Sequence, residues 1–134
     1  MFFLSIFIFS SSILISQNLS LEKLNSNLGA SFRGLDVINK KVVWVSGTQG
    51  TVLKTNDGGS TWKDVSVPNN TETDFRDIEA FDDKIAIVMG ISTPARFYKT
   101  NDGGKSWDLV YFNENKEVFF DGMSFWNKNN GIAF

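Results

Sequence analysis

The sequence predicts an all-β protein, and an internal repeat is the main observation behind that prediction. The string TNDGGSTW at residues 55–62 recurs as TNDGGKSW at residues 100–107, an offset of 45 residues. Short runs rich in β-branched and aromatic residues flank both copies, and Gly, Asn, Asp or Pro bound each run, as is typical of strands. A repeat of about 45 residues that carries four short strands is typical of one blade of a β-propeller.

The repeat extends beyond the octapeptide and has three copies, since Phe32, Phe75 and Phe120 fall in one column when the copies are aligned. The expected strands lie at residues 32–37, 42–46, 52–55 and 62–67 in the first copy, at 75–81, 85–89, 96–100 and 107–112 in the second, and at 119–126 and 131–134 in the third. We therefore expect blades at about 31–68 and 74–113 and an incomplete blade at about 118–134. Because propellers close with roughly four to eight blades, we expect this to be the N-terminal part of a larger ring.

The first sixteen residues are uncharged and consist mostly of Phe, Ile, Leu and Ser. A spanning helix needs about 20 apolar residues, and this run is shorter and interrupted by three serines. We therefore predict a signal peptide at 1–16 and a linker at 17–30, and hence a secreted, periplasmic or cell-surface protein without a stable membrane span. A weak anchor and a buried apolar strand are the alternatives for this segment, which lacks the usual basic residues after Met1.

Composition excludes several classes of function. The chain has no Cys and no His, which removes disulfides, Cys–His or Ser-His-Asp catalysis and the usual zinc sites. A formal net charge of −2 gives no indication of a nucleic-acid partner. We expect no cofactor and no metal.

The repeated octapeptide is predicted to be a structural hairpin turn. Its glycines can adopt positive φ angles, its Asp can accept hydrogen bonds from the turn's own N–H groups, and its Trp can pack beneath the hairpin. The structural residues expected here are Thr55, Asp57, Gly59, Trp62, Thr100, Asp102, Gly104 and Trp107. Calcium binding is the alternative, but the EF-hand pattern requires a Glu at position twelve that does not follow here.

Charged residues follow the aligned Phe in each copy, where a plain strand would be apolar. Arg33, Arg76 and Asp121 share one column, and Asp77 and Glu79 lie close by. The first strand of a blade is innermost, so we expect this column near the mouth of the central channel. Two guanidinium groups there could clamp a carboxylate or phosphate. The alternative is an inter-blade network in which the two arginines pair with the three carboxylates.

The octapeptides match the Asp-box, S/T-x-D-x-G-x-x-W, of the bacterial neuraminidase repeats found in sialidases and other propellers. The longer strings SFRGL, WVSGTQGTVLKT, DFRDIEAFD, FYKTNDGG, FFDGMSFW and GIAF resemble exported bacterial proteins related to the photosystem II stability and assembly factors. The resemblance covers about residues 30–134. It implies a seven-bladed propeller, and it implies a protein-binding role because the photosystem factors bind a membrane-protein precursor.

Two functions are compatible with these observations. The first is an exported, non-enzymatic propeller that binds a protein or glycan partner on the channel face, with no catalytic residues in this chain. The alternative is a glycoside hydrolase of the sialidase-like Asp-box type, with most of its catalytic residues in other blades. Retaining enzymes place two carboxylates about 5–5.5 Å apart and inverting enzymes about 6.5–9.5 Å apart. The local carboxylates available for such a pair are Asp77, Glu79 and Asp121.

Overall fold

The computed structural model describes residues 20–23 and 29–134. Within these ranges all regular structure is β, in three antiparallel sheets. The predicted signal peptide and most of the predicted linker lie outside the described residues. No helix that could cross a bilayer occurs in the part of the chain that the structure describes.

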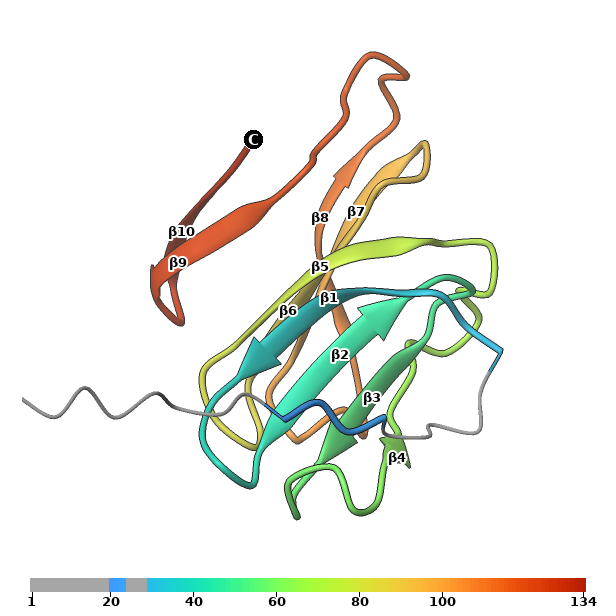
Figure 1. Cartoon of the computed structure of the whole chain (residues 1–134). Helices are drawn as coiled ribbons and strands as arrows, with labels where there is room; N and C mark the ends of the chain where they lie inside the picture. Colours follow the sequence, from blue (N-terminus) through green and yellow to red (C-terminus); the bar gives the residue numbers. More distant parts are fainter. Residues whose placement is uncertain (1–19, 24–28) are drawn as a thin grey trace, which may run out of the picture.

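The first two sheets each have four strands that follow one another in chain order (Figure 1). Blade 1 contains β1 (Phe32–Val37), β2 (Val43–Gly47), β3 (Val52–Thr55) and β4 (Lys63–Asp64), and blade 2 contains β5 (Phe75–Ala80), β6 (Ala86–Gly90), β7 (Ala95–Thr100) and β8 (Asp108–Asn113). The third sheet pairs β9 (Met123–Asn127) with β10 (Asn130–Ala133). This meander within each sheet confirms the all-β prediction, and most strands lie within one residue of their expected bounds.

The fourth strand of blade 1 is shorter than expected, because β4 covers two residues where the sequence predicts strand over 62–67. Side-chain hydrogen bonds replace part of the ladder here, although the Val65 N–H still donates to the Val52 carbonyl oxygen at 2.9 Å. The Asp64 carboxylate accepts from the Ser66 N–H at 3.0 Å, and the Ser66 hydroxyl takes the Val52 N–H at 3.0 Å in place of a backbone carbonyl. Such local bonds compete with regular pairing. In the third copy the first strand begins at Met123 and not at Phe119.

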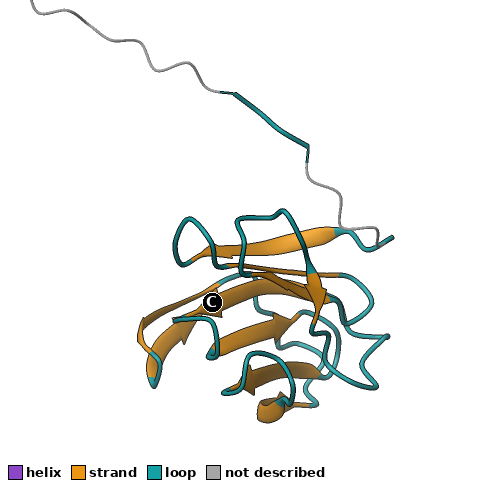
Figure 2. Ribbon diagram, turned by 90° about the horizontal axis from the view of Figure 1, so that it is seen from below, coloured by secondary structure: helices purple, strands orange, loops and turns teal. Residues whose placement is uncertain are grey.

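The sheets are stacked face to face, as the view from below shows (Figure 2). One apolar core lies between blades 1 and 2 and includes Trp44, Val65, Phe75 and Ile78. A second core lies between blade 2 and β9, where Met123 packs with residues of β6 and β7. The innermost strands β1 and β5 lie side by side, with β9 next in the series. The described residues thus form two blades and the inner part of a third.

Candidate functional site

The two Asp-box turns share most of their internal hydrogen bonds. Asp57 accepts from the Thr61 N–H at 2.9 Å, from the Thr61 hydroxyl at 2.6 Å and from the Thr55 hydroxyl at 2.7 Å. Asp102 accepts from the Ser106 N–H at 3.0 Å and the Ser106 hydroxyl at 2.7 Å. The Thr61 hydroxyl and N–H lower the pKa of Asp57 to about 2, and the Ser106 donors hold the pKa of Asp102 well below its usual range.

Backbone geometry explains the paired glycines of each box. Gly58 and Gly59 have φ angles of 74° and 91°, and Gly103 and Gly104 have φ angles of 80° and 81°. Other residues rarely adopt this left-handed region, so glycine is needed. With both Asp carboxylates occupied by donors of their own turn, the geometry is that of a structural hairpin.

The Asp-box tryptophan connects one blade to the previous one. The Trp107 indole Nε1 donates to the Val65 carbonyl oxygen at 2.9 Å, so the acceptor lies in blade 1 and not in the tryptophan's own blade. Trp62 is half-buried, and the described residues contain no acceptor for its indole N–H. The indole of Trp107 therefore stabilises a blade interface as well as a turn.

The arginine column lies on β-bulges, which the sequence did not reveal. In blade 1 the register shifts between Phe32 and Gly34, so Arg33 is the extra residue of a bulge. In blade 2 the shift lies between Phe75 and Asp77, which makes Arg76 the corresponding extra residue. A bulge re-aims the side chain of its extra residue and is common beside functional sites. The innermost strands of two neighbouring blades thus carry equivalent bulges, and the extra residue of each bulge is an arginine.

The two arginines differ in their partners. Arg76 forms an ion pair with Asp121 at 2.5 Å, and the side chains are 38% and 52% exposed. Arg33 is exposed and has no carboxylate within 4.0 Å among the described residues. The expected inter-blade pairing is therefore present at one arginine, while the other guanidinium is open to solvent.

The carboxylates near this column accept hydrogen bonds from the backbone of the next blade. Asp77 accepts from the Met123 N–H at 2.8 Å, and Glu79 accepts from the Phe125 N–H at 3.3 Å. Asp36, which occupies the repeat position of Glu79, accepts from the Ala80 N–H at 2.6 Å. Burial raises the pKa of Glu79. The hydrogen bond from the Phe125 N–H acts in the opposite direction, and the negative charges of Asp36 and Asp77 raise the pKa further. These carboxylates link innermost strands that share no ladder.

Two lysines repeat a second inter-blade contact. The Lys54 ammonium donates to the Asp83 carbonyl oxygen at 2.8 Å and to the Gly103 carbonyl oxygen at 3.4 Å. It also lies 4.9 Å from the centre of the Trp44 ring, and burial lowers its pKa. Lys99 donates in the same way to the Lys128 carbonyl oxygen at 2.8 Å. Sequence reasoning missed Asp36, Lys54 and Lys99, although the two lysines occupy one column of the repeat.

The described residues hold no group of three or more acidic residues that could bind a metal ion. The chemical feature of the innermost strands is that two neighbouring strands, β1 and β5, each carry an arginine on a bulge, while the nearby carboxylates already have partners. Such an arrangement can bind an anion, since guanidinium groups form bidentate hydrogen bonds with carboxylates.

Comparison with known proteins identifies the family. The model of the family described as photosynthesis system II assembly factor YCF48 matches residues 15–118, which is more than half of the chain. The chain belongs to this family. No curated protein matches the chain.

Two solved YCF48 structures are similar to this chain. YCF48 bound to D1 peptide matches with a TM-score of 0.64 and 20% identity, over 78% of this chain and 34% of that one. YCF48 from Cyanidioschyzon merolae matches with a TM-score of 0.55 and 25% identity, over 70% of this chain and 30% of that one. The likeness shows the fold, and the chain spans about a third of the length of the YCF48 chains that it matches.

Proposed function

We propose that this chain forms the arginine-bearing part of an exported, non-enzymatic β-propeller that binds a segment of a partner protein on its channel face. Family membership supports the assembly-factor character of the proposal. The observation that carries it is the pair of bulged arginines, Arg33 and Arg76, on neighbouring innermost strands.

The partner chemistry that fits these arginines is an extended peptide with a carboxylate. Arg33 offers a guanidinium that needs no displacement, because no described carboxylate pairs with it. Arg76 offers a second one that is held by Asp121 and is partly exposed. A peptide carboxylate could bind Arg33 directly and could compete with Asp121 for Arg76, since both interactions are charge-assisted.

A binding role is favoured over hydrolysis by the occupied carboxylates. Asp77 and Glu79 accept backbone N–H groups of the third sheet, and Asp121 is bound to Arg76. An acid–base pair in a hydrolase needs carboxylates that are free to exchange protons with the substrate. The similar structure of YCF48 bound to D1 peptide adds support for a peptide ligand.

Calorimetric titration with a D1 peptide, and separately with a sialylated oligosaccharide, tests the proposal. We expect the peptide to bind, and we expect Arg33→Gln to weaken binding by about tenfold to a hundredfold, since a hydrogen bond to a charged group contributes about 1.5–3 kcal/mol. The double variant Arg33→Gln, Arg76→Gln should bind no peptide and should melt close to the parent temperature, since exposed ion pairs contribute about 0–1 kcal/mol. Arg96→Gln is the matched control, because Arg96 lies on β7 and stacks on Phe112 at 5.6 Å.

Unchanged peptide affinity in the double variant would refute the proposed site, as would binding of the oligosaccharide alone. Export can be measured independently by fusing residues 1–30 to a reporter enzyme that is active only outside the cytoplasm. A reporter that stays inactive would refute export and leave the peptide site untouched.

A further inference from the structure

The outer strands of blades 1 and 2 differ in length and in chemistry. In blade 1 the outer strand β4 contains only Lys63 and Asp64, which are both charged and exposed. In blade 2 the outer strand β8 has six residues, and Leu109–Phe112 forms an uncharged run at its centre. Each is the last strand of its sheet, so one edge of its backbone has no ladder partner among the described strands. Shortness and charged residues protect such edges from further pairing, and the centre of β8 has neither.

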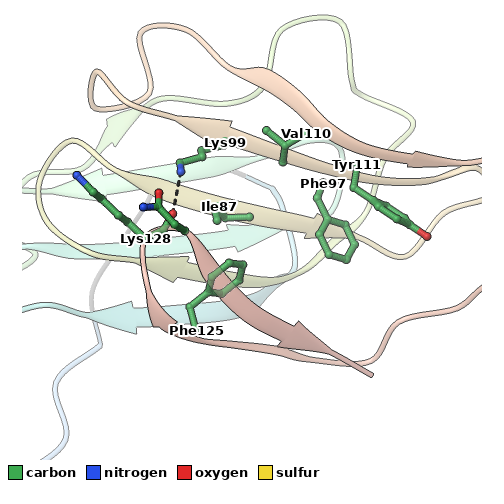
Figure 3. Close-up of a pocket in the computed structure, with 8 residues that line it drawn as sticks. Ile87, Phe97, Lys99, Val110, Tyr111, Phe125 and Lys128 are labelled. Atoms are coloured by element: carbon green, nitrogen blue, oxygen red, sulfur yellow. Dashed lines mark hydrogen bonds between the residues drawn. The ribbon is translucent and has the colours of Figure 1, made fainter.

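The apolar side chains of β8 are divided between two faces of the sheet. Phe97 and its cross-strand partner Tyr111 lie on the face toward β9, as Figure 3 shows. The opposite face carries Arg96 with its own cross-strand partner, Phe112, because residues that lie directly opposite share a face and successive residues alternate. A register shift farther along β8 brings Leu109 to this same face.

This second face is turned toward blade 1 but is only partly covered by it. Tyr98, the cross-strand partner of Leu109, is buried in the core between the two blades, and its hydroxyl donates to the Asn70 side-chain oxygen at 2.7 Å. Farther out the cover ends, since Leu109 is 50% exposed and Phe112 is 47% exposed. Both blades that border this face are described over all four strands. The shortness of β4 therefore leaves the outer part of β8 open to solvent.

Arg96 adds a cation to the exposed face. Its guanidinium lies 5.6 Å from the centre of the Phe112 ring, a cation–π contact, and the described residues place no carboxylate within 4.0 Å of it. Blade 1 lacks this combination, because Thr51 stands 45 residues before Arg96 and Asp64 stands 45 residues before Leu109. The patch of two apolar side chains and one guanidinium is thus a property of blade 2 and not of the repeat.

We infer that the outer edge of blade 2 binds an extended segment of a partner protein, which pairs with β8, covers Leu109 and Phe112 with apolar side chains and presents a carboxylate to Arg96. In this mode of recognition, main-chain hydrogen bonds to the free edge supply affinity and alternate side chains supply specificity. Charge complementarity favours such a segment over a second copy of β8. A copy paired antiparallel would keep its one carboxylate, Asp108, on the opposite face, where Asp108 lies across from Lys99.

The inference is independent of the arginine site on the innermost strands, because β8 and β5 form opposite edges of the blade 2 sheet. It adds an outer surface to the channel face as a place where the chain contacts a protein.

Calorimetric titration of the whole chain with designed strand peptides tests the inference. The probe is a peptide of about nine residues, enough to span β8, in which valine and threonine alternate and one central valine is replaced by glutamate. We expect this peptide to bind, and we expect its glutamine version to bind about tenfold more weakly because the charge-assisted bond to Arg96 is lost. A version with N-methyl groups on the amides that face β8 should not bind, since it cannot donate to the edge.

Variants of the chain locate the site. Leu109→Asp introduces the residue type that blade 1 has at this position and should weaken binding of the glutamate peptide by about tenfold or more. Leu35→Asp is the matched control, because Leu35 is an exposed leucine on β1, and it should bind the peptide as the parent does. Arg96→Gln should bind the glutamate and glutamine peptides equally.

Failure of the glutamate peptide to bind, or equal binding with and without backbone methylation, would overturn the inference. Equal affinities of the parent and a folded Leu109→Asp variant would do the same. If that variant does not fold, the comparison of the three peptides on the unmodified chain decides the result. Dimerisation of the chain that depends on Leu109, without peptide binding, would assign the edge to a second copy and overturn the inference as well.

Discussion

Blades 1 and 2 have the same repeat and the same strand order, yet equivalent residues differ greatly in burial. Leu35 in β1 is 64% exposed, whereas Ile78 in the same column of β5 is 2% exposed. Blade 2 lies between blade 1 and β9, while the face of β1 that carries Leu35 has no neighbour among the described residues. The comparison teaches that a neighbouring blade, and not the repeat sequence, determines how much each apolar residue contributes to stability.

Replacing the aligned phenylalanines by alanine should give the largest difference between the blades in the loss of unfolding free energy. Phe75 is fully buried, and Phe32 is 37% exposed. Phe75→Ala should lower the free energy of unfolding by about 3–5 kcal/mol, because it leaves a cavity in the shared core. Phe32→Ala should lower it by less than about half as much, since part of the ring is already in water. Urea unfolding of the two variants measures the difference, and equal losses would contradict the role assigned to the neighbouring blade.

Replacing the two Asp-box tryptophans by alanine should give a smaller difference in the loss of unfolding free energy. Trp107→Ala removes a ring from the interface and leaves the Val65 carbonyl oxygen without its donor, so we expect a loss of about 2–3 kcal/mol. Trp62→Ala removes a half-buried ring without a described acceptor and should have the smaller effect. Thermal unfolding of both variants checks the order. A larger loss for Trp62 would show that the indole contact with blade 1 contributes little.

The smallest expected effect is the pH dependence of the Asp-box turns. Because the pKa of Asp57 is lowered from 3.8 to about 2 in the folded chain, its stabilising contribution is complete above pH 4 and is lost as the pH falls toward 2. The pKa of Asp102 is lowered further, so its contribution persists to lower pH. Urea titrations between pH 5 and pH 2 should show a shallower loss of stability in Asp57→Asn than in the parent. An unchanged slope would mean that the turn does not stabilise the ionised carboxylate.

The repeat predicted most strands because alternating apolar and polar residues, glycine turns and the Asp-box are all features of short stretches of sequence. It failed at β4, where the Asp64 and Ser66 side chains replace ladder bonds that periodicity assumes. It also aligned the two arginines in one column, but a bulge depends on pairing register, which no single strand reveals. Asp36 and Lys54 look like ordinary solvent-facing residues of a strand. Their roles become visible only when the backbone of the next blade lies beside them.

The carboxylate contacts between innermost strands also have a geometric consequence. A ladder fixes two strands at about 4.8 Å, whatever their side chains. Between β1 and β5 the backbone of one strand is instead reached by the Asp36 carboxylate, and between β5 and β9 by the longer Glu79 carboxylate. At this repeat position the bridging side chain differs by one methylene group from one seam to the next, whereas the Asp77 carboxylate, which also reaches β9, has no counterpart in β1, where Gly34 stands. At the β1–β5 seam, which the Asp36 carboxylate bridges, an Asp-to-Glu exchange can therefore change the spacing of the two strands, with every ladder in the blades left intact.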